Sequence, residues 1–320
     1  MKRTLRRVLP AVAAAVLFAA LAACGESAST AGQGGGGGAD PDTLVFAAVP
    51  SEQTTTLQQN YQPVLDMLSK VTGKKVEFRQ ATNYAAVIEA QLSGQVQIAA
   101  YGPLSYVIAK SKDAGITAVG AQITAKGAAP GYKSYAITKA GSPIKSLKDF
   151  AGKNICFVDP DSTSGYLYPS AELLENGIDP ATGVHPIFAG GHDASVLEVA
   201  SGRCDAGFAE DSMVDTTLIQ SGQLKPGQIT TLLKSEEIPG SPVAISTTLS
   251  PELQKTLTDA FQNKANVDYL QANGFCPPGA KGACTIGDGG GWGFAPVDDS
   301  FYNTIRQVCD VTKNKSCTQA

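Results

Sequence analysis

Short apolar runs alternate with amphipathic segments along this chain, and the alternation occurs twice. In the first part, each apolar run is followed by a segment with helical spacing. The expected strands here are 44–49, 76–79 and 96–100. The pattern begins again after 132–138. The expected strands of this second part are 154–158, 183–189 and 205–209. Strands that alternate with helices predict a mostly parallel sheet with helices on both faces.

The two α/β units predict two lobes joined by two crossings near residues 137 and 243. An expected return strand at 242–246 and a long helix at 251–270 bring the chain back to the first unit. We assign residues 42–136 and 244–320 to lobe 1 and residues 137–243 to lobe 2. In such sheets ligands bind beyond the carboxyl ends of the strands, where helices begin. We therefore look for a site at those ends.

The N-terminus has the features of an export signal. Four basic residues precede an apolar run at 8–20 that is too short to span a bilayer comfortably. The next residues, Leu21-Ala22-Ala23-Cys24, resemble the bacterial lipobox, in which the cysteine is lipidated and becomes the mature first residue. We expect a lipoprotein signal peptide at 1–23, a flexible Gly- and Ser-rich tether at 24–41, and anchoring to the outer face of the cell membrane. An ordinary signal with a chance cysteine is the alternative.

The charge of the mature chain excludes some classes of partner. Loss of the signal removes four basic residues, so the formal net charge falls from −4 to −8, with 21 basic and 29 acidic residues left. No basic cluster indicates nucleic acid, and no later apolar run reaches bilayer length. Since the overall field would repel an anion, an anionic ligand must be held by local dipoles.

Six cysteines remain once Cys24 is assigned to lipid. In an exported protein an even set suggests disulfides, although the sequence alone cannot fix their pairing. The expected pairs are Cys156–Cys204, Cys276–Cys284 and Cys309–Cys317. The last two would close short loops. For Cys156 and Cys204, which both lie at expected strands, two buried thiols are an equally good interpretation.

One stretch joins an expected strand to an expected helix through three hydroxyl residues. It reads Asp159-Pro160-Asp161-Ser162-Thr163-Ser164-Gly165. The first turn of a helix has backbone N–H groups without internal partners, and the helix dipole makes that end partly positive. Hydroxyl groups beside those donors would suit a small oxyanion. Helix capping is the alternative, but one cap would suffice.

Other polar residues fall at strand ends. Tyr84 opens an expected helix and Tyr101 ends an expected strand, and a phenol offers one donor to an oxyanion in a cleft wall. His192 begins a helix, where the dipole disfavours a charged imidazole. Glu210 and Asp211 follow a strand and line the same opening or are simply solvated. Packing for the tyrosines and capping for the histidine are the alternatives.

Enzymatic motifs are missing from the sequence. It contains no Gly-x-Ser-x-Gly elbow, no His/Cys cluster with zinc spacing, and no phosphate-binding P-loop or dinucleotide fingerprint. The glycine runs at 34–38 and 287–291 lack the strand-then-helix setting that such fingerprints need. We expect a protein that is not an enzyme and that has no cofactor or metal.

Several stretches resemble the phosphate, phosphite and phosphonate substrate-binding proteins of ABC importers. Apart from the Asp159–Gly165 turn, they are Asn83-Tyr84-Ala85-Ala86-Val87-Ile88, Ala100-Tyr101-Gly102, Pro130-Gly131-Tyr132, Gly191-His192-Asp193 and Ile238-Pro239-Gly240-Ser241-Pro242. The resemblance covers residues 42–270. It implies a two-lobed periplasmic-binding-protein fold of type II-like topology, a permease partner and a protein that acts as a monomer.

The resemblance also implies a ligand set. Ser162, Thr163 and Ser164 would hold the phosphorus oxygens, and Tyr84, Tyr101 and His192 would complete the pocket. Members that take an aminoalkyl phosphonate use carboxylates at positions that fall here on Ser212 and Ser241. We therefore expect phosphite, a small phosphonate such as methylphosphonate, or phosphate. An aminoalkyl phosphonate is the alternative, with Glu210 or Asp211 as the partner of its amine.

Two further expectations complete the hypothesis. The tail at 275–320 departs from the family core and is interpreted as a disulfide-stapled extension on lobe 1 without an assigned role. The competing functions are a sensor subunit with the same fold and an exported phosphoester hydrolase, since fold alone does not set function.

Overall fold

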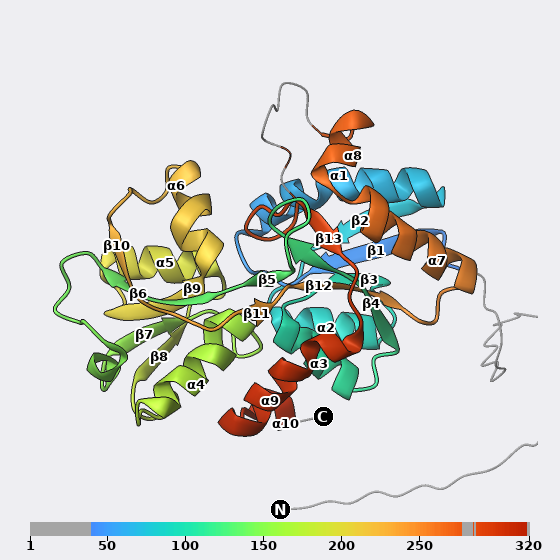
Figure 1. Cartoon of the computed structure of the whole chain (residues 1–320). Coiled ribbons are helices and arrows are strands. Elements are labelled where there is room, and N and C mark those ends of the chain that lie inside the picture. The colour runs from blue at the N-terminus through green and yellow to red at the C-terminus, as the bar shows by residue number, and fades with distance from the viewer. Residues whose placement is uncertain (1–39, 277–283, 285, 319–320) are drawn as a thin grey trace, which may run out of the picture. The chain divides into compact units, whose positions relative to one another are not determined.

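The computed structural model describes residues 40–276, 284 and 286–318, which contain two separate mixed sheets (Figure 1). The lobe 1 sheet has six strands in the order β13-β4-β12-β3-β1-β2. The first elements of this lobe are β1 (Thr43–Ala48), α1 (Thr54–Thr72), β2 (Lys75–Arg79), α2 (Tyr84–Leu92), β3 (Ile98–Ala100), α3 (Pro103–Ser111) and β4 (Ile116–Ile123). The expected strand and helix order of this lobe is confirmed.

The lobe 2 sheet has five strands in the order β10-β6-β9-β7-β8. Its strands are β6 (Ser134–Lys139), β7 (Asn154–Phe157), β8 (His185–Phe188), β9 (Ala206–Glu210) and β10 (Ile229–Lys234). Its helices are the 3-10 turn η1 (Leu147–Phe150), the π-helix η2 (Thr163–Leu167), α4 (Tyr168–Glu175), α5 (His192–Ser201), the π-helix η3 (Met213–Thr217) and α6 (Leu218–Gln220). The turn with three hydroxyl residues, Ser162-Thr163-Ser164 (the hydroxyl turn), therefore leads into a π-helix instead of an ordinary α-helix.

Each sheet has a parallel centre and antiparallel additions. In lobe 1, β1 pairs in parallel with β2 and β3, whereas β12 (Pro242–Ser246) is antiparallel to both β3 and β4. In lobe 2, β7 pairs in parallel with β8 and β9, whereas β6 is antiparallel to β9 and β10. The sheets are mixed because the strands that enter from the crossings run against the βαβ units.

The two crossings pair with each other and lie between the lobes in Figure 1. They form the short antiparallel ladder of β5 (Gly131–Tyr132) and β11 (Ile238–Pro239), in which Ile238 lies opposite Tyr132. The lobe 2 sheet already begins at Ser134, and the lobe 1 sheet resumes at Pro242. The crossings therefore come slightly before the positions near 137 and 243 that the sequence suggested.

Both faces of each sheet are covered, as the α/β pattern predicted. On β1, Leu44 and Phe46 pack into one core of lobe 1, and Ala47 packs into the core on the other face. In lobe 2 the same alternation divides Ile137 from Ala136 on β6. Burial of consecutive strand residues on both faces explains why these strands are continuous apolar runs in the sequence.

The C-terminal tail is part of the folded body. After α7 (Pro251–Asp259), η4 (Ala260–Lys264) and α8 (Val267–Ala272), the chain adds β13 (Gly293–Ala295) to the edge of the lobe 1 sheet beside β4. It continues through η5 (Asp299–Tyr302), α9 (Asn303–Thr312) and α10 (Lys315–Thr318). Helix α9 packs against α3 of lobe 1 and α4 of lobe 2. The tail therefore contacts both lobes and is more than an extension on lobe 1.

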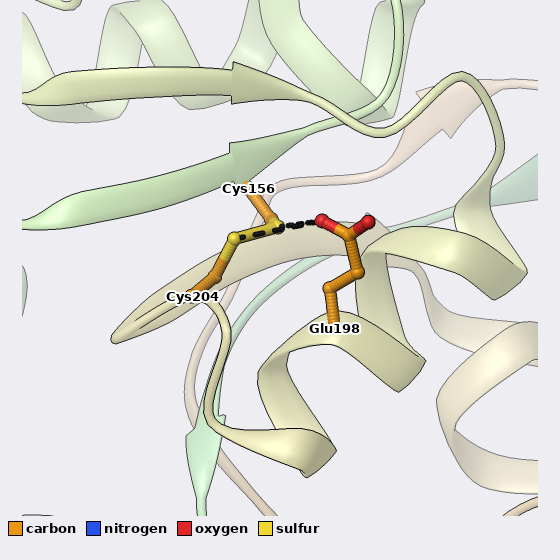
Figure 2. Close-up of side chains that lie close together, drawn as sticks. All are labelled: Cys156, Glu198 and Cys204. Carbon is orange, nitrogen blue, oxygen red and sulfur yellow. Dashed lines mark hydrogen bonds between the residues drawn. A yellow bond between two sulfur atoms is a disulfide. The ribbon is translucent and has the colours of Figure 1, made fainter.

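The three expected disulfides are confirmed as Cys156–Cys204, Cys276–Cys284 and Cys309–Cys317. The first joins β7 to the segment before β9, and Glu198 of α5 lies beside it (Figure 2). An Oε2 atom of Glu198 is 3.2 Å from Sγ of Cys156. Although two sulfurs and a carboxylate can bind a metal, both sulfurs here are consumed by the disulfide. Glu198 instead pairs with Arg203 at 3.2 Å.

The expected signal peptide, Cys24 and nearly all of the tether lie outside the described residues. Within the described part of the chain, no helix combines the length and apolar character needed to cross a membrane.

Candidate functional site

Helix starts from both lobes meet between the two sheets. The backbone N–H of Leu104, at the start of α3, donates to Oγ1 of Thr163 in lobe 2 at 2.8 Å. In the opposite direction, the N–H of His192, at the start of α5, donates to the carbonyl of Ser51 in lobe 1 at 2.6 Å. The N–H of Tyr84 at the start of α2 lies 3.4 Å from Oδ2 of Asp159. The site therefore lies where positive helix ends converge, and the lobes are closed on each other.

The residues of the hydroxyl turn make different hydrogen bonds. Ser162 caps η2, because its Oγ accepts from the N–H of Gly165 at 3.1 Å, so the capping interpretation holds for this residue. The carbonyl of Ser164 accepts from Oγ of Ser134 at 2.7 Å. In contrast, Oγ of Ser164 is buried and has no hydrogen-bond partner in the described part of the chain. A buried hydroxyl without a partner is costly, so this atom is suited to meet a ligand.

The π-helical start increases the number of available donors. The N–H of Tyr168 reaches back to the carbonyl of Thr163, and the N–H of Leu167 reaches the carbonyl of Ser162 at 3.0 Å. Because each bond spans one residue more than in an α-helix, one additional N–H group at the helix start lacks a helical partner. This geometry favours an oxyanion at Thr163 and Ser164.

The tyrosines differ from the sequence expectation. Tyr84 is buried beside Ser162, and burial raises its pKa well above the ordinary value. Tyr101 lies in the lobe 1 core, where its hydroxyl donates to Oε1 of Gln91 at 2.7 Å. Tyr132 on β5 has its hydroxyl beside those of Ser164 and Thr163, and burial raises its pKa. The structure thus brings Tyr84 and Tyr132, but not the Tyr101 hydroxyl, to the hydroxyl turn.

His192 is held as a neutral donor. Its Nδ1 accepts from the backbone N–H of Glu210 at 3.0 Å, so the ring proton is on Nε2. Burial lowers the pKa of His192 to about 3. The imidazole therefore contributes a hydrogen-bond donor without a positive charge, as its place at a helix start suggested.

Carboxyl groups line the other side of the site. Glu210 is buried and accepts from Oγ of Ser212 at 2.9 Å. A small cavity of about 40 Å³ is lined by Tyr132, Glu210, Ser212, Ser241 and Asp288, together with Gln122, Thr124 and four glycines. Asp211 lies apart from it, on a wider outer groove of about 640 Å³ between the lobes. Of the four expected tail contacts, Glu210, Ser212 and Ser241 therefore line the inner cavity.

Three residues of the site were not expected from the sequence: Tyr132 and Asp288, which line the inner cavity, and Glu52, which is buried beside Asp288. Burial first, and then the neighbouring Asp288 and Asp193 charges, raise the pKa of Glu52 to about 8. Burial raises the pKa of Asp288 to about 6 and raises that of Glu210. The residues that line the inner cavities include no lysine or arginine. Tyr132 lies within a stretch that already resembled the family, whereas nothing local marked Glu52 or Asp288.

Two α/β lobes, two paired crossings and a polar cavity between the lobes define a solute-binding protein of the periplasmic type. The family described as ABC transporter, phosphonate, periplasmic substrate-binding protein matches residues 46–302. The chain belongs to this family. The match extends past residue 270, where the sequence resemblance ended, and includes the glycine run and β13.

Relatives agree with this assignment. The chain is 46% identical to the phosphate-import protein PhnD of Mycolicibacterium smegmatis over 96% of this chain and 97% of that protein. It is 31% identical to the phosphonates-binding periplasmic protein of Escherichia coli over 69% of this chain and 65% of that protein. A binding component of a Pseudomonas aeruginosa ABC phosphonate transporter superposes with a TM-score of 0.73 at 26% identity, covering 86% of this chain and 87% of that one.

These proteins are substrate-binding subunits, so the chain is an extracytoplasmic binding protein of an ABC importer and not an enzyme. A PhnD1 structure from Prochlorococcus marinus in complex with methylphosphonate shares the fold, with a TM-score of 0.71 at 20% identity over 86% of this chain and 100% of that one.

Proposed function

We propose that the protein captures a small phosphorus oxyanion without a cationic tail, namely phosphate, phosphite or a phosphonate such as methylphosphonate, and delivers it to the permease. The observation that carries the proposal is the unpartnered, buried Oγ of Ser164 at the start of η2, beside the Tyr132 hydroxyl. A 46% identical relative bears the name of a phosphate-import protein, which supports the same ligand class.

The proposed contacts are the hydroxyls of Ser162, Thr163 and Ser164, those of Tyr84 and Tyr132, and Nε2 of His192. All are neutral donors, and hydrogen bonds from neutral donors to an anion are strong. Because no lysine or arginine lines the inner cavities, release does not require the separation of a buried ion pair. Tyr101 is left out because its hydroxyl is already donated to Gln91.

Capture would proceed by hinge closure. Lobe 2 presents the hydroxyl turn and His192, and lobe 1 presents Tyr84. Bending at the β5–β11 crossings brings these groups together around the ligand. We also propose that Cys24 carries the lipid anchor, that the protein acts as a monomer, and that it is held at the outer face of the membrane near its permease.

Calorimetric titration of the purified full chain tests the ligand class. The ligands are phosphate, phosphite, methylphosphonate, aminoethylphosphonate and sulfate. We expect the tightest binding for one of the first three. Tightest binding of sulfate or aminoethylphosphonate, or no binding of any of them, would contradict the proposal.

A further inference from the structure

A short glycine-rich loop from the C-terminal tail forms one wall of the inner cavity. The loop is closed by two hydrogen bonds between Ile286 and Gly291, of 3.0 Å and 2.7 Å. Lobe 1 holds it through Gln122 Nε2, which donates to the Asp288 carbonyl at 2.6 Å, and through Asn60 Nδ2, which donates to the Gly287 carbonyl at 3.2 Å. The loop is therefore fixed to lobe 1 by its backbone.

The same loop touches lobe 2. Oγ1 of Thr217 donates to the carbonyl of Gly289 at 3.3 Å. A Cβ atom on Gly289 would lie 2.8 Å from Oε1 of Glu210, and the residue has φ +60°, so only glycine fits here without strain. Gly289 lines both the outer groove of about 640 Å³ and the inner cavity of about 40 Å³. The loop thus separates the two spaces.

Asp288 points an unsatisfied acceptor into this region. It lines both the 40 Å³ cavity and a neighbouring cavity of about 10 Å³ that Ser51 also lines. Its Oδ1 is buried without a hydrogen-bond partner in the described part of the chain, and so is Oγ of Ser51, a residue that is 1% exposed. A buried carboxyl oxygen without a donor is costly, and the lining residues supply no cation. The Ser51 hydroxyl and the Gly289 N–H are the donors that the chain offers to the Asp288 carboxyl, and a ligand in the 40 Å³ cavity can supply a further one.

We propose that Asp288 is a specificity-determining residue that accepts a hydrogen bond from a protonated ligand oxygen. This inference rests on the proposed function. The ligand is then an oxyanion that bears a P–OH group, with the hydroxyl turn donating to its unprotonated oxygens. Phosphate keeps a proton near neutral pH and can satisfy both sides. Sulfate is fully ionised and offers only acceptors, so its oxygens would face the Asp288 carboxylate without a bridging proton.

The size of the cavity favours this ligand over a longer one. A water needs about 10–15 Å³ of such space, so 40 Å³ holds roughly three or four water-sized groups. A tetrahedral anion with four oxygens is of this size. An aminoalkyl tail could also satisfy Asp288 through its ammonium group, and aminoethylphosphonate therefore belongs in the test as the competing ligand.

The test compares Asp288→Asn with the wild-type full chain by calorimetric titration with phosphate, sulfate and aminoethylphosphonate. The amide is isosteric but can donate. We expect phosphate affinity to fall about 10- to 100-fold, the range for a hydrogen bond to a charged group, while sulfate affinity is unchanged or increases. The matched control is Asp310→Asn at an exposed position on α9, which should leave all affinities unchanged.

The outcomes separate the two hypotheses. Wild-type protein that binds no phosphorus oxyanion overturns the proposed function. Wild-type protein that binds phosphate, with an unchanged phosphate-to-sulfate ratio in Asp288→Asn, overturns only the role of Asp288. A variant that loses aminoethylphosphonate but keeps phosphate also overturns it. If Asp288→Asn fails to fold, as judged by circular dichroism, Asp288→Ser, which also removes the carboxylate, should lower the same ratio, and an unchanged ratio there counts against the inference.

Discussion

Single atoms decide which hydroxyls of the site can serve a ligand. Tyr101 donates its one hydroxyl proton to Gln91, whereas Ser162 and Thr163 each accept a backbone N–H and keep their own O–H to donate. Ser164 is buried without a partner, and Tyr132 lies beside it. Tyr101, which is buried, and Tyr132, which is half-buried, are therefore a matched pair of phenols, the first assigned to packing and the second proposed for binding.

Removing each phenol hydroxyl separates these roles. Tyr132→Phe should weaken phosphate binding by about 1–3 kcal/mol, because a hydrogen bond to a charged group is lost. Tyr101→Phe should leave the affinity unchanged and lower the free energy of unfolding by about 1–3 kcal/mol, since Oε1 of Gln91 then remains buried without its donor. Calorimetry and urea unfolding measure the two effects. The reverse pattern would restore Tyr101 to the site.

Thr163 tests the hydroxyl turn itself. Thr163→Val keeps the shape of the side chain but removes the hydroxyl, and binding should weaken by about 1–3 kcal/mol if that hydroxyl contacts the anion. The same change also removes the acceptor for the Leu104 N–H, so unfolding must be measured beside affinity. Equal ligand affinity in the variant and the wild type would leave Thr163 as an interlobe contact only.

For single residues, the sequence predicted which residue types occur at the site better than it predicted which way their side chains point. The turn at 159–165 was predictable because a strand, three hydroxyls and a helix follow one another locally. The choice between Tyr101 and Tyr132 was not, because the direction of a ring depends on Gln91 and on the neighbouring strand. Asp288 carries no local signal, since its neighbours in space are Ser51 and Glu210 from distant segments.

Among the elements, the loop at 286–291 is the one whose position beside the cavity the sequence did not predict. A glycine run without a following helix lacks the setting of a nucleotide-binding loop, and that exclusion was sound. Its positive φ values, +72° at Gly287, +60° at Gly289 and +82° at Gly290, instead allow a tight turn against Gln122 and Glu210. The contacts that explain the glycines are long-range and leave no periodic pattern.

Gly289→Ala should prevent the loop from closing against lobe 2. The new methyl group would collide with Glu210 and Ser212 and would hold the lobes apart, so phosphate affinity should fall at least about tenfold. The sole tryptophan, Trp292, follows this loop directly and its emission can report the closure. Phosphate should change Trp292 emission in the wild type and change it less in the variant.

The matched control is Gly274→Ala, which has a similar φ of +73° but has no atoms near its Cβ position. It carries the same backbone strain without the collision. If both variants lose affinity equally, strain and not closure is the cause.

At the scale of the whole molecule, the two lobes and their order were predictable because α/β alternation is a repeated local pattern. The mixed pairing was not, since β6 and β12 read as ordinary apolar strands and only the crossings set their direction. Burial also raises the pKa of several carboxyl groups, with consequences for stability. Glu52, and Glu172 on α4, each have a pKa raised to about 8, with burial as the main cause.

The unliganded protein should therefore lose stability between pH 7 and pH 9. A folded-state pKa near 8 against an unfolded value of 4.5 means that the folded form holds a proton that the unfolded chain has lost. The stabilisation is complete below about pH 4.5 and is lost as the pH rises from there through about 8; the part of this loss that falls between pH 7 and pH 9 is about 1 kcal/mol for Glu52. His192 is neutral in the folded state throughout.

Thermal unfolding followed by circular dichroism at pH 7, 8 and 9 measures this loss. Glu52→Gln should flatten the dependence, and Glu172→Gln, outside the site, should flatten it without altering phosphate affinity. A midpoint that stays constant or rises over this range contradicts the expected protonation of Glu52.

The position of Tyr132 on β5 has a mechanical consequence. The residue that faces the hydroxyl turn also belongs to the β5–β11 ladder, about which we propose that the lobes bend. A solute that displaces this ring by a fraction of an ångström acts at the pivot, and the far tips of the lobes multiply that displacement. In this proposal, a ligand of the wrong size would hold the lobes at a different angle, even when it is bound tightly.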